Sequence, residues 1–244
     1  NYLPTRIVDF LSLALNYHFG GLAVEGYHIV NLAIHVAAAC LVFWLVVLTL
    51  RTPTLREAGS GRYGALLALC AGLLFVAHPV QTESVTYIHQ RSTSLAGLFY
   101  LLSLCCYARA RLAAAGSRAY TGFYVGAFAA AILGMLTKEN TITLPLAILL
   151  YEYSFLRQKG KASWKEAAPF LIILAVIPLM MLVTKPITFH HVDRLTQHPK
   201  LGWYYFLTQV HAKATYARLV FLPLNQNIDY DYPLSQRILD PGVL

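Results

Sequence analysis

The chain has 244 residues, of which 57% are hydrophobic and 12% charged, and its mean hydropathy is +0.54 with a net charge of +8. Soluble domains carry about 25% charged residues, so this composition excludes an ordinary water-soluble enzyme, and the high apolar content excludes a disordered chain. At roughly 20 apolar residues for each bilayer crossing, the length allows six or seven spans with loops.

Apolar runs separated by Gly, Pro and charged residues predict an all-α, polytopic transmembrane bundle. An amphipathic segment at residues 5–19 comes first and suits a helix lying in the membrane interface. Six predicted spans follow, at residues 27–50, 63–77, 80–110, 120–136, 142–155 and 168–183. Residues 203–222 contain too many polar side chains for a span, so they favour a second interfacial helix, which carries Arg218.

The positive charges predict the orientation of the bundle. The loops at residues 51–62, 109–118 and 157–166 hold ten of the 19 Lys and Arg residues, and with Glu152 they hold three of the 11 acids. Seven of the eight net charges therefore lie there, which places these loops in the cytoplasm. The basic excess indicates topology and not nucleic-acid binding. Eight of the nine histidines fall on the opposite, outer side, where we expect the chemistry.

Polar side chains open the first predicted span. Tyr27, His28, Asn31 and His35 are spaced so that they share one side of a helix. Polar groups at membrane depth face a bundle interior or a wet cavity. The pattern is therefore open to two interpretations: a stripe of interhelical hydrogen bonds or the lining of a ligand cavity. The spacing of the two histidines, seven residues apart, does not favour a metal site.

The third predicted span begins with an unusually polar stretch. Pro79 suits a first helical turn, and Glu83, Tyr87, Gln90, Arg91 and Ser94 then share one face if a single helix runs through them. Arg91 would lie just inside the membrane boundary and would need an anion. Its partner would be a carboxylate, that of Glu83 or Glu139, or a lipid phosphate, whose oxygens the guanidinium fork binds in pairs.

The sequence Lys138-Glu139-Asn140 joins two apolar spans without a Gly or Pro spacer. A surface ion pair would explain it. The alternative is a cation and a carboxylate that point into the same outer cavity as Glu83 and Arg91. Arg218 is either a second phosphate ligand or an arginine that extends to the membrane surface without a role in binding.

All four cysteines, at positions 40, 70, 105 and 106, fall within predicted spans. We therefore expect small buried apolar residues and no disulfide. No part of the sequence has metal-site spacing, and no cofactor is expected.

Several segments together resemble one family. They are residues 27–35 (YHIVNLAIH), 78–87 (HPVQTESVTY) with Gln90-Arg91, 134–140 (GMLTKEN) and residues between 207 and 230. Their order and spacing are similar to those of the membrane domain of bacterial tetratricopeptide-repeat glycosyltransferases of the GT-C superfamily. These are relatives of the transmembrane and tetratricopeptide-repeat protein O-mannosyltransferases. Arg6 also matches an arginine of this family.

The resemblance implies an inverting enzyme without a metal that transfers a mannose-like sugar from a polyprenyl phosphate to a protein hydroxyl. Its active face would be periplasmic, in a bacterial inner membrane. It further implies that residues 1–244 are part of one GT-C-like domain, preceded by a span with an acidic loop that carries the general base, and followed by more spans and tetratricopeptide repeats. The expected partners are the lipid-linked donor, the acceptor protein and membrane lipids, with a larger membrane complex as a further option.

The residues divide into three expected roles. Arg91, Lys138 and Arg218 would stabilise the departing phosphate. Glu83 and Glu139 would position substrates. A third group would line the cavity, namely Arg6, His28, Asn31, His78 and Tyr87. A competing hypothesis is a non-catalytic membrane subunit that uses the same fold to hold a partner or lipid. A transporter is disfavoured because no paired, broken helices lie at mid-membrane.

Overall fold

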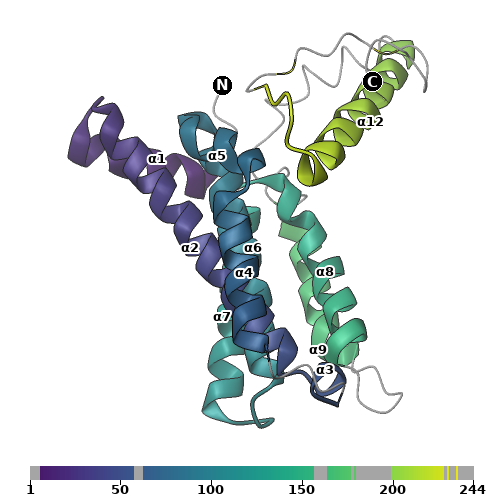
Figure 1. Cartoon of the computed structure of the whole chain (residues 1–244). Coiled ribbons are helices and arrows are strands. Elements are labelled where there is room, and N and C mark those ends of the chain that lie inside the picture. Colours follow the sequence, from purple (N-terminus) through teal and green to yellow (C-terminus); the bar gives the residue numbers. More distant parts are fainter. Residues whose placement is uncertain are drawn as a thin grey trace. The chain divides into compact units, whose positions relative to one another are not determined.

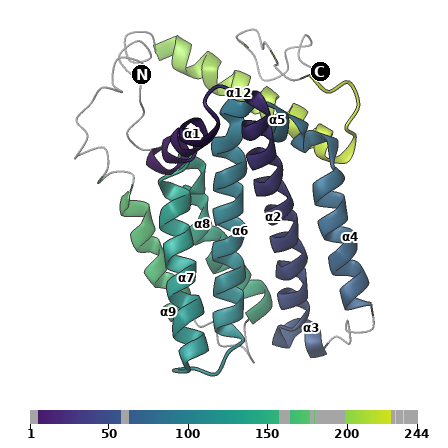
Figure 2. The same ribbon diagram turned by 90° about the vertical axis from the view of Figure 1, so that its left-hand side faces the viewer.

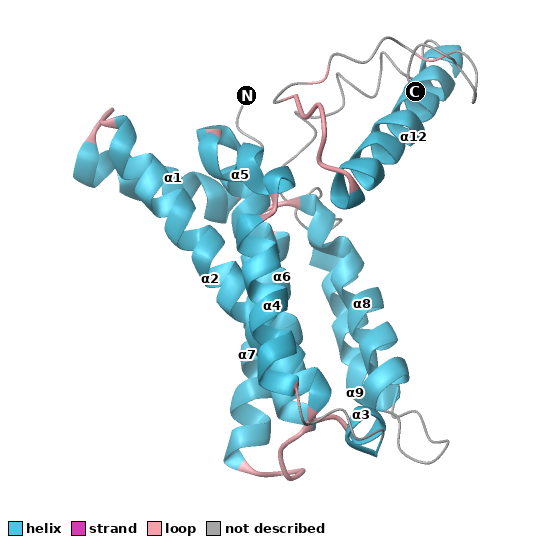
Figure 3. Cartoon of the chain, viewed as in Figure 1, coloured by secondary structure: helices cyan, strands magenta, loops and turns pink. Residues whose placement is uncertain are grey.

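A computed structural model describes residues 6–57, 63–156, 164–176 and 199–227, and the single residues 179, 230 and 235. The chain divides into two units, residues 1–183 and 184–244, which are described separately below. Every regular element in the described part is helical (Figure 3). The all-α prediction is therefore confirmed for these residues.

The first unit is a bundle whose helices run alternately up and down (Figure 1). The helices along its length are α2 (Val24–Leu50), α4 (Gly64–Ala77), α6 (Arg91–Arg111), α7 (Arg118–Met135) and α8 (Leu144–Tyr151). The chain also forms α1 (Ile7–Gly20), before α2, and a set of shorter elements: α3 (Pro53–Glu57), η1 (Pro79–Gln81), α5 (Thr82–Thr86), η2 (Ile88–Gln90), η3 (Glu139–Thr143), η4 (Glu152–Leu156), α9 (Trp164–Ala167) and η5 (Ala168–Ala175).

The two ends of this bundle differ in the elements that they hold. We call the end with α1, α5, η2 and η3 the polar end, and the end with α3, η4 and α9 the basic end (Figures 1 and 2). The described parts of the three basic loops, including Arg51, Arg111 and Arg118, all lie at the basic end. The three basic loops thus lie at one end of the bundle, as their predicted location on one side of the membrane requires.

Two of the described helices are long and apolar enough to cross a membrane, Val24–Leu50 and Ile88–Arg111. The pair Gly64–Ala77 and Pro79–Thr86, bent by 49°, would make a third span. The apolar parts of the first three predicted spans, at residues 27–50, 63–77 and 80–110, lie within these helices. Most of residues 177–183, the end of the predicted sixth span, lie outside the described residues.

The prediction of one continuous helix over residues 80–110 is wrong. Residues 79–90 form three short helical pieces, and α6 begins only at Arg91. The His78 side chain accepts a hydrogen bond from the backbone N–H of Val80 and so begins a new turn after the bend. Tyr87 then takes an extended conformation with ψ 109°, which ends α5. Glu83 and Arg91 consequently do not share one helical face.

Small residues allow α6 and α7 to approach closely in the core. Ala108, Ala127 and Ala131 have no exposed surface, and the Ser103 hydroxyl donates to the carbonyl of Ala127 at 2.8 Å. Close approach over small residues is how membrane helices gain packing energy without a hydrophobic driving force. The cysteine prediction holds for positions 105 and 106, which are buried, but is wrong for positions 40 and 70, which lie on exposed faces of α2 and α4.

A buried ion pair joins α6 to η4 at the basic end. The Glu152 side chain is 2% exposed and forms a two-bond pair with Arg111, at 2.8 and 3.0 Å. The Tyr107 hydroxyl donates to the same carboxylate at 2.8 Å. Because both carboxylate oxygens are hydrogen-bonded and the charge is matched, the burial is compensated.

The second unit contains α12 (Pro199–Phe221), as predicted for residues 203–222. Ser235 contacts this helix: its N–H donates to the Thr208 hydroxyl at 2.9 Å, and its hydroxyl contacts His211 at 2.7 Å. Arg218 lies in the last turn of α12 and is exposed.

Candidate functional site

A chain of side-chain hydrogen bonds crosses the polar end. The ammonium of Lys138, between α7 and η3, donates to the Thr93 hydroxyl on α6 at 2.6 Å. Thr93 donates to the Gln90 side-chain carbonyl at 2.7 Å, and the Gln90 amide donates to Glu83 at 2.8 Å. The structure therefore brings together Glu83 and Lys138, which lie 55 residues apart in the sequence.

Lys138 retains donors for a ligand at the polar end. An ammonium has three donors, and within the described residues one is used, by Thr93. Burial lowers the pKa of Lys138, and the neighbouring charge of Arg6 adds to this effect, while acidic neighbours, Glu139 first, oppose it. A half-buried ammonium whose charge is incompletely compensated favours the binding of an anion.

Arg6 and Glu139 form the ion pair that holds α1 against the loop after α7. Two hydrogen bonds connect them, at 3.2 and 2.9 Å, and the backbone N–H of Val8 donates to the carbonyl of Leu136 at 3.1 Å. The two side chains are 22% and 36% exposed. Glu139 is thus oriented by Arg6, in line with the ion-pair interpretation of the Lys138-Glu139 sequence.

Asp9 was not identified as a site residue from the sequence. Its side chain is buried at the polar end on α1, and its Oδ1 has no hydrogen-bond partner in the described part of the chain. Burial raises the pKa of Asp9, although His89, Arg6, Arg91 and Lys138 pull it in the opposite direction. A polar stripe on α1, formed by Asp9, Ser12 and Asn16, was the available signal.

Arg91 is fully buried, and its contacts differ from both partners that were considered. Its guanidinium donates to Asn31 at 2.7 Å, to Asn16 at 2.8 Å, and to the backbone carbonyls of Tyr27 and Ser12 at 3.0 and 3.2 Å. All these acceptors are neutral, on α1 and α2. In this arrangement Arg91 joins two helices to α6, and its donors are directed at protein atoms.

The polar stripe on α2 makes interhelical hydrogen bonds. Besides accepting from Arg91, Asn31 donates to the carbonyl of Val85 at 3.2 Å. His35 contacts the carbonyl of Val76 through Nε2 at 3.1 Å, and its ring stacks on Phe75. These carbonyls lie in the last turns of α5 and α4, where no intrahelical donor remains. The geometry of Asn31 therefore follows the first of the two interpretations, whereas His35 makes such a contact and also lines a cavity of about 330 Å³.

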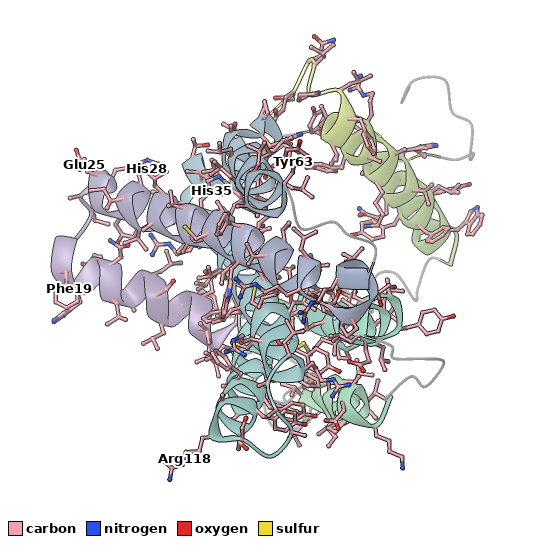
Figure 4. All side chains as sticks on the ribbon, turned by 60° about the horizontal axis from the view of Figure 1, so that its bottom comes forward. Phe19, Glu25, His28, His35, Tyr63 and Arg118 are labelled. Carbon is pink, nitrogen blue, oxygen red and sulfur yellow. The ribbon has the colours of Figure 1, made fainter. Side chains whose placement is uncertain are left out.

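The other cavity-lining candidates do not contribute side chains to the hydrogen-bond chain of Lys138, Thr93, Gln90 and Glu83. His28 is exposed beside Glu25 at the start of α2, with His35 further along the same helix (Figure 4). His78 begins η1 as described above, and Tyr87 is 54% exposed with its ring against His89. Arg218 belongs to the second unit and is described only within α12.

Among the described residues, no group of three His, Cys, Asp or Glu side chains could hold a metal ion.

Sequence reasoning missed two residues of the site, Thr93 and Asp9. Thr93 could not have been found, since a lone threonine in a Ser-Thr-Ser run carries no distinctive signal.

Comparison with known proteins finds similarity to protein O-mannosyl-transferases. The chain is 34% identical over 152 residues to TMTC2 of Homo sapiens, which covers 62% of the chain and 17% of that protein. It is 36% identical over 144 residues to tmtc2 of Xenopus laevis, with coverages of 58% and 16%. A match to Tmtc2 of Drosophila melanogaster, 27% over 241 residues, covers 96% of the chain and 24% of that protein.

These matches support the part of the resemblance that concerns the protein O-mannosyltransferases. The chain spans between about a sixth and a quarter of the length of these relatives. No family model matches the chain, and no solved structure matches it.

Proposed function

We propose that the chain is part of a membrane glycosyltransferase that moves a mannose-like sugar from a polyprenyl phosphate to a hydroxyl of an acceptor protein. The names of its relatives support the reaction class. The observation that carries the donor class is Lys138: a half-buried ammonium with unused donors, at one end of helices that are apolar enough to cross a membrane. A lipid-linked phosphate would bring its anion to that depth.

The transfer replaces one bond to the anomeric carbon by another. The acceptor oxygen attacks this carbon, the bond to the phosphate oxygen breaks, and the phosphate leaves with the electron pair, which inverts the configuration. Lys138 would stabilise the charge on the leaving phosphate. The hydroxyl proton would pass to a carboxylate, which the family resemblance places in a loop before residue 1.

The geometry redistributes the roles expected from the sequence. Lys138 is the proposed phosphate ligand in the first unit, and Glu83 positions it through Gln90 and Thr93. Arg91 becomes a positioning residue that fixes α1 and α2 against α6.

The remaining residues keep supporting roles in the proposal. Arg6 and Glu139 hold the loop that carries Lys138. Arg218 remains the proposed second phosphate ligand, supplied by α12. His28, His78 and Tyr87 would contact the sugar or the acceptor.

The exposed face of α1 supports an interfacial position at the membrane. Ile7, Leu11, Leu15 and Phe19 recur at every fourth residue and are 50–84% exposed. Another face carries the acceptors of Arg91, which are the side-chain carbonyl of Asn16 and the backbone carbonyl of Ser12. A helix with its polar side toward protein and its apolar side outward suits contact with lipid. We therefore propose a GT-C-like bundle of about six spans with interfacial helices, α1 and α12, on the extracytoplasmic side.

The wider context follows the family resemblance. We propose that this bundle is part of one GT-C-like domain in a longer protein with tetratricopeptide repeats. The positive-inside rule would place the basic end in the cytoplasm, so the polar end would face the periplasm of a bacterial inner membrane.

A donor-selection assay tests the proposal. The purified protein in nanodiscs would be given an acceptor peptide and mannose linked either to a polyprenyl phosphate or to a nucleotide. We expect transfer from the lipid-linked donor alone. Transfer from the nucleotide donor alone would overturn the proposed donor class. Tight binding of the lipid-linked donor without transfer would favour the non-catalytic subunit.

A further inference from the structure

Arg109 lies in the last turn of α6, at the basic end of the bundle. It follows Cys105 by four residues and Cys106 by three, so the three side chains lie on one side of the helix. Cys105 donates to the carbonyl of Leu41 on α2 at 3.3 Å. A Cβ at Gly126 on α7 would lie 3.6 Å from the Sγ of Cys106. Arg109 therefore leaves α6 one turn beyond the point where α2 and α7 both pack against this helix.

An aromatic pair holds the Arg109 side chain in place. Its guanidinium carbon lies over the ring of Phe123 on α7, 5.2 Å from the ring centre. The Phe123 ring contacts Trp44 on α2, with 6.4 Å between the two ring centres. The face of an aromatic ring attracts a cation, and the three side chains are half-buried. The contact thus restrains the arginine before a ligand binds, which lowers the entropic cost of binding.

The N–H donors of Arg109 have no acceptor in the described part of the chain. A guanidinium has five donors, and Arg109 makes no hydrogen bond or ion pair with any described residue. Arg111, two residues further on, uses its fork on the buried carboxylate of Glu152. Two arginines of one helical turn therefore differ, because Arg111 is neutralised by the protein and Arg109 is available to an anion.

The position of Arg109 along α6 corresponds to the level of lipid headgroups. The segment Ile88–Arg111 is long and apolar enough to cross a membrane, and Arg109 is two residues from its end. Trp44 agrees with this level, because tryptophan is enriched at the boundary between membrane and water. Arg51 lies exposed just after α2, seven residues or nearly two turns from Trp44. A second cation thus lies on the side of α2 that faces Phe123.

We propose that Arg109 binds the phosphate of an anionic phospholipid at the basic end of the bundle. The guanidinium fork matches two phosphate oxygens, and Trp44 and Phe123 give the first carbons of the lipid an apolar wall. Neither Arg109 nor Arg51 has a carboxylate partner among the residues that the structure describes, which favours a headgroup with net negative charge over a zwitterionic one. The site depends neither on Lys138 nor on the transfer reaction.

Quenching of Trp44 fluorescence measures lipid binding at this site. The reference protein keeps Trp44 and carries Trp164→Phe and Trp203→Phe, in phosphatidylcholine nanodiscs with a rising fraction of bromine-labelled phosphatidylglycerol. We expect phosphatidylglycerol to quench at lower fractions than bromine-labelled phosphatidylcholine does. Arg109→Gln should raise the fraction needed for half-quenching about fivefold, which is the effect of losing one cation next to anionic lipid.

Arg118→Gln is the matched control, because it removes an equal charge from the same end of the bundle. The Arg118 side chain is exposed and points away from the helices (Figure 4), so salt screens it and half-quenching should stay within about twofold of the reference protein. Arg109→Lys keeps the charge but cannot bind two oxygens at once, and its loss should lie between those of the two glutamine variants. Thermal unfolding shows whether each variant is folded.

Several results would overturn the proposal. Equal losses in Arg109→Gln and Arg118→Gln would assign the effect to the overall charge of the basic end. Reference-level quenching in Arg109→Gln, or in Arg109→Lys if the glutamine variant does not fold, would remove Arg109 from the site. Equal quenching of the reference protein by the two lipids would show that the negative headgroup is not recognised. Displacement of the labelled lipid by glycerol phosphate at matched ionic strength would identify a site for soluble phosphate instead of lipid.

Discussion

Each end of the bundle buries a carboxylate, but the two carboxylates differ in how completely they are hydrogen-bonded. At the basic end, Glu152 accepts three hydrogen bonds and is paired with one arginine. At the polar end, Asp9 is also buried, yet one of its oxygens has no partner among the described residues, and the cations around it outnumber the acids in its immediate surroundings. The first arrangement is complete within the protein, and the second leaves charge that a ligand can use.

Whether the protein itself uses all the hydrogen-bonding atoms of a buried group distinguishes structural from functional polar groups better than burial alone. Arg91 shows why, because it is the most deeply buried cation at the polar end and its donors are all directed at protein acceptors. Lys138 is less buried and has one such partner. The phosphate-binding role is therefore proposed for Lys138, whose donors remain available.

Removal of the basic-end carboxylate should have the largest effect on stability. Glu152→Ala leaves the Arg111 guanidinium without its anion, and breaking a buried pair in this way costs about 3–5 kcal/mol. Thermal unfolding of the purified protein in detergent measures the loss. Glu139→Ala serves as the control, since its partner Arg6 is partly exposed. Equal losses in the two variants would remove the distinction between the ends.

Substitution of Arg91 should also destabilise the protein. Arg91→Met leaves the acceptors on Asn16 and Asn31 without their donor, at a cost of about 1–3 kcal/mol for each group that stays buried. Arg91→Lys should rescue little, because an ammonium cannot reproduce the geometry of the guanidinium fork. The same unfolding experiment checks both variants. Wild-type stability in Arg91→Met would contradict the positioning role.

The buried carboxyl of Asp9 should make stability depend on pH. Because burial raises its pKa above the ordinary value of 3.8, the native state keeps this proton over a pH range in which the unfolded chain has lost it. Stability contributed by Asp9 is therefore greatest below the ordinary pKa and falls as the pH rises through the native pKa, by at most about 1.4 kcal/mol per pH unit.

Asp9→Asn should remove this decline, so the variant gains stability relative to the wild type as the pH rises. Chemical unfolding at a series of pH values gives the difference. Parallel curves for the two proteins would show that Asp9 does not titrate differently in the native state.

The smallest effect is expected at the exposed ion pair of the polar end. Glu139→Gln removes the partner charge of Arg6, whose pair is partly open to solvent, and pairs of this kind contribute about 0–1 kcal/mol. Unfolding should therefore change little, and high salt should reduce the difference further. A loss of stability as large as that of Glu152→Ala would mean that the Arg6–Glu139 pair is as strongly stabilising as the buried pair at the basic end.

The sequence predicts the helices and the two ends well, because long apolar runs and clustered basic loops are strong local signals. Residues 24–50 and the loops at residues 51–62 and 109–118 are examples. It fails where the chain bends. The break at Tyr87 comes two residues after Val85, whose carbonyl accepts a hydrogen bond from Asn31 of α2, a contact that no local pattern reveals.

That bend also decides the candidate site. With one straight helix, Glu83 and Arg91 share a face, whereas in the structure Arg91 turns toward α1 and α2, and Glu83 reaches Lys138 through Gln90 and Thr93. The partners of a buried side chain are set by tertiary packing, which spacing along one helix cannot specify.

The central claim is that Lys138 stabilises a leaving lipid phosphate at the polar end. The most direct measurement is the rate of mannose transfer from a polyprenyl phosphate donor by Lys138→Met, with Lys165→Met, an exposed lysine at the basic end, as the control. Loss of one such electrostatic contact costs about 10²–10³ in rate, so we predict that loss for Lys138→Met with unchanged unfolding temperature, and wild-type rates for Lys165→Met. Wild-type transfer by a folded Lys138→Met protein would contradict the account.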